Sequence, residues 1–236
     1  ASPENVWKSI SGSTLNMAFA GVFDGQGHTI SGLYGTDGQS LFNLLAATGV
    51  IKNLKLTNSY VEYNKDTSGW RVFGSIANRS CGTLNTVYSD AIVASNGLYV
   101  GGLVGMVRGE GPSTITNSCF AGELRLDTTK DDIGKCGGIA GAVYDADCTI
   151  SHCLNTGSID YCPNEGGIVG MVETKGSLKV ADSFNAGLVG ANKGDKTYYG
   201  VGSIVGRANS GPITVSNTYA TSESCSGNLI DQKSSA

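Results

Sequence analysis

Acidic side chains gather in two segments of the chain and could bind calcium or act as an acid/base pair. The first group is Asp127, Asp131 and Asp132 beside Lys130, and the second is Asp145 with Asp147. Polysaccharide lyases and glycosidases use either facing carboxylates or carboxylate-bound calcium together with a basic residue. Both groups fall in stretches whose length differs between repeats of the chain, where a rigid pair is not expected. We therefore interpret them as solvated loops, with a calcium site at Asp127, Asp131 and Asp132 as the alternative.

The chain has two histidines, and neither lies in a pattern typical of catalysis. His28 closes the segment Phe23–His28, which also contains Asp24, but no nucleophile lies close by in the sequence. The glycines Gly25 and Gly27 permit a turn with positive φ, so a structural turn is the favoured interpretation. A His-Glu-x-x-His motif, the signature of many zinc peptidases, is absent from the sequence.

Five aromatic residues stand just before glycine-rich segments and could form a binding surface. They are Trp70, Tyr99, Tyr161, Tyr198 and Tyr199. If successive segments stack, these rings line up along one edge, where they could pack on sugar rings or cover an apolar patch of a protein. The alternative is that the rings only cover the bases of loops and the seams between coils.

A short glycine-rich motif repeats along the chain and determines the expected fold. It reads Gly-Gly-Leu-Val-Gly at 101–105, with similar copies at 137–141, 166–170 and 202–206 and a diverged copy at 74–77. The aligned apolar positions, at separations of 27, 36, 29 and 36 residues, are Ile76, Leu103, Ile139, Ile168 and Ile204. This period matches one coil of a solenoid with loops of variable length.

A second short strand follows each copy and contains a column of polar residues. If Ile115 is its first position, the third position is Asn117 in that coil and His152, Asp182 and Asn217 in later coils. In a regular strand the first, third and fifth positions share a face, so the sequence predicts that these four side chains form an inward, hydrogen-bonded ladder. His152 is then a member of the ladder rather than a catalytic base.

Composition and periodicity agree with this interpretation. The 35 glycines, the charged fraction of 15% and the recurrence of apolar residues at every second position favour short strands and turns over helices. The sequence predicts an all-β chain that forms a right-handed parallel β-helix of about six coils with variable loops. We expect the β-helix to span residues 1–222 and a polar tail or linker to occupy 223–236.

Charge and cysteine usage argue against several partners and cofactors. With a net charge of −4 and scattered basic residues, no nucleic-acid partner is expected. No direct membrane insertion is expected either, because no stretch approaches the roughly 18 unbroken apolar residues of a membrane helix. The seven cysteines include no Cys-x-x-Cys pair, which favours buried thiols or one or two bridges over a metal-thiolate site. No cofactor is expected, with calcium as the alternative.

Segments of the N-terminal third add a resemblance to a known family. They read Trp-Lys-Ser-Ile at 7–10, a longer stretch from Phe19 to Leu33, Leu-Phe at 41–42 and Ile-Lys-Asn-Leu at 51–54. Together with the Gly-Gly-Leu-Val-Gly copies, they resemble the repeats of GLUG-motif proteins over about residues 4–222. Such repeats occur in large bacterial surface and secreted proteins, including adhesin-like proteins and non-catalytic regions of immunoglobulin-A-cleaving metallopeptidases. The resemblance implies a β-helix in a secreted or cell-surface protein.

These observations favour a non-catalytic extracellular module for binding or adhesion. Its expected partner is a glycan or a host or cell-surface protein, and other domains are expected in a longer parent chain. A carbohydrate-active β-helix enzyme and a purely structural stalk are the alternatives. Facing carboxylates in a cleft would favour the enzyme, an aromatic-lined hollow the binding module, and the absence of both the stalk.

Overall fold

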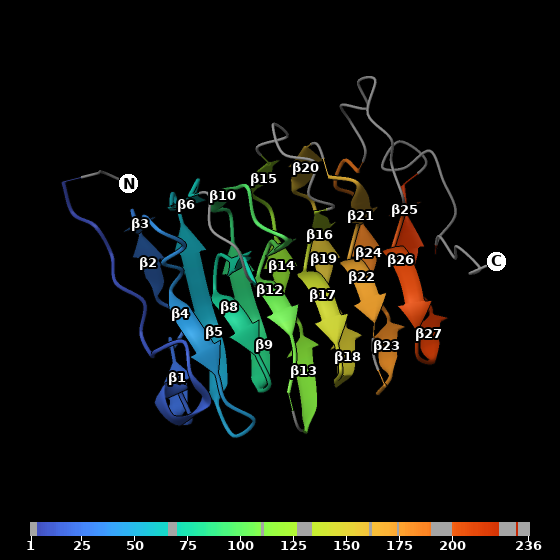
Figure 1. Ribbon diagram of the computed structural model, residues 1–236, viewed down its shortest axis with the longest axis horizontal. Coiled ribbons are helices and arrows are strands. Elements are labelled where there is room, and N and C mark those ends of the chain that lie inside the picture. The colour runs from blue at the N-terminus through green and yellow to red at the C-terminus, as the bar shows by residue number, and fades with distance from the viewer. Residues whose placement is uncertain are drawn as a thin grey trace.

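The protein is a parallel β-solenoid of about five turns, as seen in a computed structural model. The structure describes residues 4–65, 70–109, 111–126, 134–160, 162–173, 175–189, 200–221 and 230. The coils follow one another along the long axis in chain order, from blue to red in Figure 1. Outside the described residues lie Asp127, Asp131, Asp132, Tyr161, Tyr198, Tyr199 and, except for Ile230, the expected tail at 223–236.

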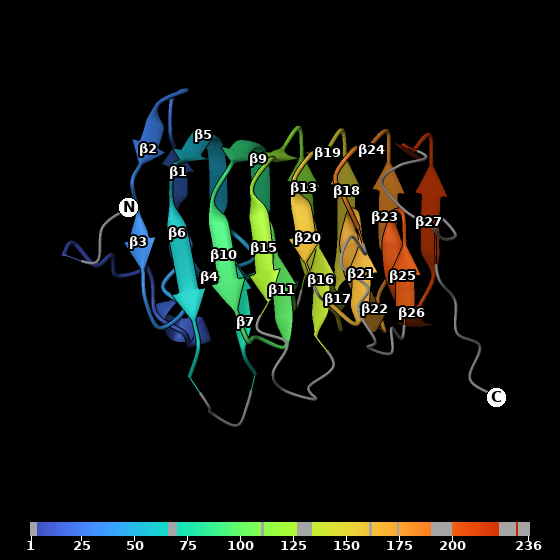
Figure 2. The ribbon, with the colours of Figure 1, turned by 90° about the horizontal axis from the view of Figure 1, so that it is seen from above.

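Each turn of the solenoid runs through four sheets. One turn passes from β9 (Thr83–Ser89) to β10 (Ile92–Ser95), β11 (Tyr99–Gly101) and β12 (Val104–Val107), and β13 (Pro112–Thr116) then pairs with β9 to begin the next turn. The strand pairings of the described residues are parallel in all four sheets, which confirms the expected fold class. Figure 2 shows equivalent strands of successive coils side by side.

The remaining strands extend these four sheets, which we number in the order in which a coil crosses them. Sheet 1, of twelve strands, also contains β1 (Val22–Asp24), β2 (Thr29–Ser31), β5 (Val50–Thr57), β14 (Cys119–Phe120), β18 (Asp147–Ser151), β19 (Leu154–Asn155), β23 (Leu178–Ala181), β24 (Phe184–Asn185), β27 (Ile213–Ser216) and β28 (Tyr219–Ala220). Sheet 2, of five strands, adds β3 (Tyr34–Gly35), β6 (Tyr60–Tyr63), β15 (Glu123–Leu126) and β20 (Ser158–Asp160). Sheet 3, of five strands, adds β7 (Val72–Gly74), β16 (Lys135–Gly137), β21 (Asn164–Gly166) and β25 (Gly200–Gly202). Sheet 4, of six strands, adds β4 (Phe42–Leu45), β8 (Ala77–Ser80), β17 (Ala140–Tyr144), β22 (Val169–Glu173) and β26 (Val205–Ser210).

Helical structure is sparse, as the lack of helical periodicity predicts. In the described residues it is limited to the 3-10 turn η1 (Leu15–Met17). No helix in this part of the chain is long and apolar enough to cross a membrane.

The apolar positions of the repeated motif form the centre of the core. Ile76, Leu103, Ile139, Ile168 and Ile204 are each 0% exposed. Each coil is hydrogen-bonded to the next at this position, as in the bond from the Ile139 N–H to the Ile168 carbonyl (3.0 Å). The predicted stacking of the repeats is therefore confirmed.

The glycines of the motif allow neighbouring backbones to touch. A Cβ atom added at Gly101 would lie 1.9 Å from the Val104 carbonyl oxygen, and one at Gly105 would lie 2.6 Å from the Phe73 backbone nitrogen. Any side chain at these positions would therefore push sheets 3 and 4 apart. The repeat keeps glycine where two backbones meet at this edge of the coil.

The predicted inward ladder is wrong in its direction. Asn117, His152, Asp182 and Asn217 occupy equivalent corners of successive coils, but their side chains are exposed. Each has a left-handed backbone, with φ between 46° and 53°. A left-handed residue interrupts the two-residue alternation of a strand, so the inward positions after it are the fourth and sixth rather than the third and fifth.

The side chains that point inward after the corner include a different set of polar residues. At the fourth position Ser118, Cys153, Ser183 and Thr218 are buried, and at the sixth Asn155 and Asn185 are 0% exposed. The Asn155 amide donates to the Asn185 side-chain oxygen at 2.8 Å, and the Asn185 amide donates to the Ser203 carbonyl at 3.1 Å. A buried amide ladder therefore exists, three residues further along the chain than predicted.

The cysteines of the described residues divide into one bridge and four thiols. Cys136 in β16 is bonded to Cys162, and the free thiols are Cys81, Cys119, Cys148 and Cys153. Burial raises the pKa of both Cys148 and Cys153 to about 12. Among the residues that the structure describes, no three His, Cys, Asp or Glu side chains are grouped so that they could hold a metal ion.

Candidate functional site

Two of the five aromatic residues singled out in the sequence lie together on the outer surface. Trp70 directly precedes sheet 3 and is 50% exposed, whereas Tyr99 in β11 is 7% exposed. Their rings are stacked, with centroids 5.8 Å apart and planes at 24°. This part of the predicted row of aromatic residues consists of the exposed Trp70 ring and the buried Tyr99 ring stacked on it.

Two residues that the sequence analysis missed complete this cluster. Tyr144, at the end of β17, meets Trp70 edge-on at 5.1 Å, and the Arg108 guanidinium lies 4.2 Å from the centre of the Trp70 ring. Arg108 also lies 5.0 Å from the Tyr144 ring. A signal for both was present, because each stands three residues after the last glycine of a repeated motif, Gly105 or Gly141.

The aromatic rings rest on an apolar layer outside the solenoid core. Buried side chains on the outer faces of sheets 3 and 4 form it, among them Val72, Met106 and Met171. Burial raises the pKa of Tyr99, and Glu173 adds to the increase. This apolar layer holds the aromatic rings in place. The buried Tyr99 ring therefore covers a seam between coils, as the alternative to a binding surface predicts.

Beside Trp70 the surface opens into a pocket that carries three of the five arginines in the chain. Arg71, Arg79 and Arg108 line this pocket, which has a volume of about 390 Å³ and which we call the arginine–tryptophan pocket. Among the described residues no carboxylate is ion-paired with Arg79 or Arg108. Asp37, which also lines it, is paired with Lys65 at 2.7 Å.

Polar groups in the pocket are held by the first coils. The Arg79 guanidinium donates to the Ser13 carbonyl, and the Gln39 side-chain oxygen accepts the Ser9 N–H at 2.9 Å. Asn43 also lines the pocket. The arrangement places guanidinium donors and amides around an exposed indole, a combination suited to an anionic ligand with an apolar face.

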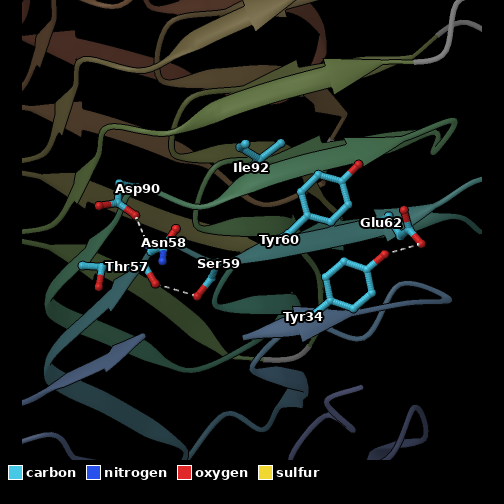
Figure 3. Close-up of a pocket in the computed structure, with 8 residues that line it drawn as sticks. All are labelled: Tyr34, Thr57, Asn58, Ser59, Tyr60, Glu62, Asp90 and Ile92. Carbon is cyan, nitrogen blue, oxygen red and sulfur yellow. Dashed lines mark hydrogen bonds between the residues drawn. The ribbon is translucent and has the colours of Figure 1, made fainter. Parts of the chain in front are cut away.

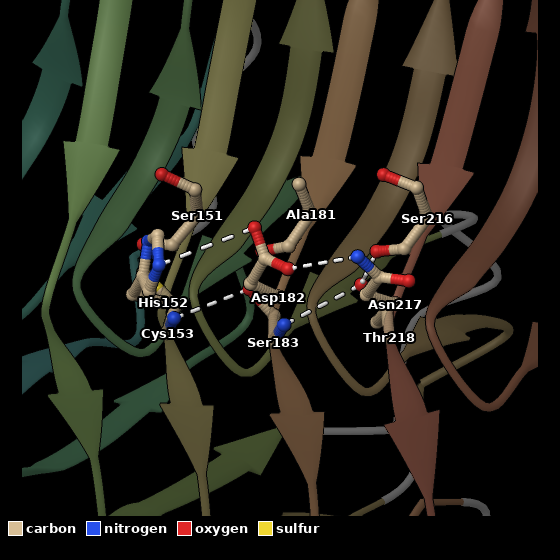
Figure 4. A network of polar contacts seen from close by, with 9 residues as sticks. All are labelled: Ser151, His152, Cys153, Ala181, Asp182, Ser183, Ser216, Asn217 and Thr218. Atoms are coloured by element: carbon tan, nitrogen blue, oxygen red, sulfur yellow. Dashed lines mark hydrogen bonds and ion pairs between the residues drawn. The ribbon is translucent and has the colours of Figure 1, made fainter.

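The exposed corner that contains His152 is a structural feature. In Figure 4 His152, Asp182 and Asn217 follow one another on adjacent coils. The His152 Nε2 and Asp182 Oδ2 atoms are 4.0 Å apart, and the Asn217 amide donates to Asp182 Oδ1 at 3.1 Å. Asn117 donates in the same way to Asn85 at 2.9 Å. These contacts link neighbouring coils at their corners, and the left-handed residues Asp182 and Asn217 are joined directly.

Other candidate carboxylates are engaged in turns. Asp24 accepts the Gln26 N–H at 2.9 Å and the Asn53 amide at 3.0 Å, and these bonds lower the pKa of the Asp24 carboxyl. Asp147 accepts the N–H and the hydroxyl of Ser177, both at 2.8 Å. Each carboxylate therefore joins one coil to the next.

The fold and the pocket define the chain as a β-solenoid with a basic, aromatic surface site. The chain is similar in sequence to one known protein and in structure to another. No model of a known protein family matches the sequence. Halomucin of Haloquadratum walsbyi (strain DSM 16790 / HBSQ001) is 39% identical over 108 residues, which is 44% of this chain. The chain spans only 1% of halomucin's length.

A solved structure shares the fold over nearly the whole chain. It is the crystal structure of a candidate immunoglobulin A1 protease from Bacteroides ovatus, with a TM-score of 0.67 and 22% identity. The similarity covers 97% of this chain and 66% of that one. At this level of identity the match supports the β-solenoid and carries no information on activity.

Proposed function

We propose that the chain is a non-catalytic binding module of a secreted or cell-surface protein, and that the arginine–tryptophan pocket binds acidic sugars. The observation that carries the proposal is that Arg79 and Arg108, for which no ion-paired carboxylate is seen among the described residues, line one pocket with the exposed Trp70 ring. In a chain whose net charge is −4, such a local excess of positive charge attracts an anion.

The chemistry of the pocket favours a sugar that carries a carboxylate or a sulfate. A guanidinium can donate two parallel hydrogen bonds to such a group, and the Trp70 indole offers apolar surface to the ring that carries it. The side chains of Gln39 and Asn43 can bond to hydroxyl groups. The volume of about 390 Å³ suits one or two sugar units.

Three observations support a location outside the cytoplasm. The Cys136–Cys162 disulfide is typical of oxidising compartments. The similarity to halomucin agrees with a surface protein in which this chain is one part of a longer polypeptide, and the resemblance of the repeats to GLUG-motif proteins agrees with a surface or secreted protein. A protein ligand with acidic side chains on a host or cell surface is the other partner that the pocket would accept.

Isothermal titration calorimetry with 3′-sialyllactose and lactose tests the proposal. We expect binding of the acidic sugar, weakening as salt is raised from about 20 to about 300 mM, and no measurable binding of lactose. Replacing Arg108 by alanine removes a charge-assisted hydrogen bond worth about 1.5–3 kcal/mol, so the Kd should rise about 10- to 100-fold.

Arg125→Gln is the matched control, because it removes the same charge from an arginine that Glu123 holds on sheet 2, at 2.6 and 2.7 Å, outside the pocket. The affinity of the Arg125→Gln variant for 3′-sialyllactose should match that of the unmodified chain. Equal loss in Arg125→Gln and Arg108→Ala would attribute binding to overall charge, and absence of any binding would leave the stalk as the better interpretation.

A further inference from the structure

A second pocket lies on the outer face of sheet 2 and differs in charge from the first. It has a volume of about 690 Å³, and Tyr34, Tyr60 and Ile92 of the adjacent strands β3, β6 and β10 contribute to its wall. These three residues are register partners on successive coils. The pocket therefore follows the stacking direction of the solenoid.

The two tyrosines form an aromatic platform. Their ring planes differ by 10° and their centroids are 5.6 Å apart, and Figure 3 shows the rings side by side. Parallel rings fixed on neighbouring strands offer flat apolar surface at little entropic cost, because both side chains are already ordered. Ile92 continues this surface on the next strand.

Carboxylates stand at both ends of the platform. Glu62 accepts a hydrogen bond from the Tyr34 hydroxyl at 3.2 Å, and Asp90 accepts the Asn58 N–H at 2.7 Å. In Figure 3 Glu62 lies beside Tyr34, and Asp90 with Asn58 lies at the opposite end of the pocket. Each carboxylate keeps oxygen lone pairs for a further donor.

The described residues that line this pocket carry negative charge and no positive charge. In this part of the chain no lysine or arginine is among them, and they are Tyr34, Thr57, Asn58, Ser59, Tyr60, Glu62, Asp90 and Ile92. Arg125 follows Glu62 on the same sheet face, two strands further on, but Glu123 holds its guanidinium through two contacts of 2.6 and 2.7 Å. The pocket therefore presents two negative charges beside two aromatic rings.

We propose that this tyrosine–carboxylate pocket binds a sugar that carries an ammonium group, such as a glucosamine unit. The carboxylates favour a cation, the tyrosine rings favour a flat apolar ring face and can also attract the ammonium, and the volume exceeds what a small ammonium ion alone would fill. The site is separate from the arginine–tryptophan pocket, whose positive charge repels the same ligand.

Calorimetry at about pH 6 with a glucosamine tetrasaccharide and its fully N-acetylated counterpart tests this site. The acetylated sugar keeps the ring and loses the positive charge, so we expect it to bind about tenfold more weakly or not at all. The variant Glu62→Gln removes one carboxylate with little change in shape and should weaken binding of the amino sugar about tenfold.

The matched control is Asp145→Asn, which makes the same charge change at an exposed residue whose left-handed backbone, φ 46°, asparagine also tolerates. It should leave the Kd for the amino sugar within about twofold, because Asp145 is not among the residues that line the pocket. Equal affinity for the two tetrasaccharides would overturn the proposal, as would an unchanged Kd in Glu62→Gln or no binding of the amino sugar.

The two pockets are tested independently. Glu62→Gln should still bind 3′-sialyllactose, and Arg108→Ala should still bind the glucosamine tetrasaccharide. Loss of both ligands in Glu62→Gln, with an unchanged thermal unfolding midpoint, would show one shared site and overturn the proposal.

Discussion

The buried amide ladder offers a direct test of how the solenoid is built. Asn185 is 0% exposed, and its hydrogen bonds include three to buried groups of the core: its side-chain oxygen accepts from the Asn155 amide and the Gly187 N–H, and its amide donates to the Ser203 carbonyl. Replacing Asn185 by leucine leaves these three groups buried without their partner. At about 1–3 kcal/mol for each group, less about 2 kcal/mol gained from the buried apolar side chain, the free energy of unfolding should fall by about 4 kcal/mol.

The exposed corner provides the matched comparison. Asn117→Gly removes one exposed hydrogen bond to Asn85 and keeps a residue that adopts the left-handed backbone, so it should cost less than about 1 kcal/mol. Urea unfolding followed by circular dichroism measures the free energy of unfolding of both variants. The urea concentration at the midpoint should be lower by about 1 M or more for Asn185→Leu than for the unmodified chain. Equal costs for the two variants, or a larger cost at Asn117, would refute the assignment of the inward column.

Two further predictions concern the cysteines. Replacing Cys136 by serine opens a bridge between residues 26 apart in the sequence, and chain entropy alone predicts a loss of about 3.5 kcal/mol, measurable by urea unfolding with and without reductant. Burial raises the thiol pKa of Cys148 and Cys153 from 9.0 to about 12. The unfolded chain therefore releases these protons above about pH 9 while the folded chain keeps them to about pH 12. Stability should fall across that window by up to about 1.4 kcal/mol per pH unit for each thiol, and a Cys148→Ala, Cys153→Ala double variant should show a smaller slope.

The parallel coil could be predicted from the sequence because its signal is local and repeated. Ile139 and Ile168 stand at the same place in the same glycine-rich motif, and a side chain that must be buried in every coil leaves a visible period. The direction of the polar column could not be predicted by alternation, because one left-handed residue resets which positions face inward. A clue was present in the residue types, since Asn117, Asp182 and Asn217 are among those that tolerate this backbone.

The candidate site was predicted only in part, for a related reason. Trp70 and Tyr99 were found because both precede a glycine-rich segment, whereas Arg108 follows one and contacts Trp70 from the next sheet. Such contacts depend on the angle between two sheets, which the spacing of residues along the sequence does not determine. Tyr34 and Tyr60 were missed because the alignment of repeats was anchored on the Gly-Gly-Leu-Val-Gly copies, and Tyr34 precedes the first of them.

The diverged copy of the motif explains why the arginine–tryptophan pocket lies where it does. Sheet 4 has six strands and sheet 3 has five. The first strand of sheet 3 is β7, which belongs to the same coil as β8, so the coil before β8 contributes no strand to sheet 3. In the next coil Gly105 must be glycine because the Phe73 backbone of β7 touches it, but the equivalent residue of β8, Asn78, meets no such strand.

Asn78 uses this space to bind the residues that replace the missing strand. Its amide donates to the Gly38 carbonyl at 2.8 Å, and its side-chain oxygen accepts from the Ser40 hydroxyl at 2.7 Å. Gly38 and Asn78 both line the pocket, directly beside Arg79. The diverged copy has Asn78 where the other copies have their last glycine, and Asn78 lines the pocket. In this chain the departure from the repeat is therefore the feature of the sequence that indicates the site.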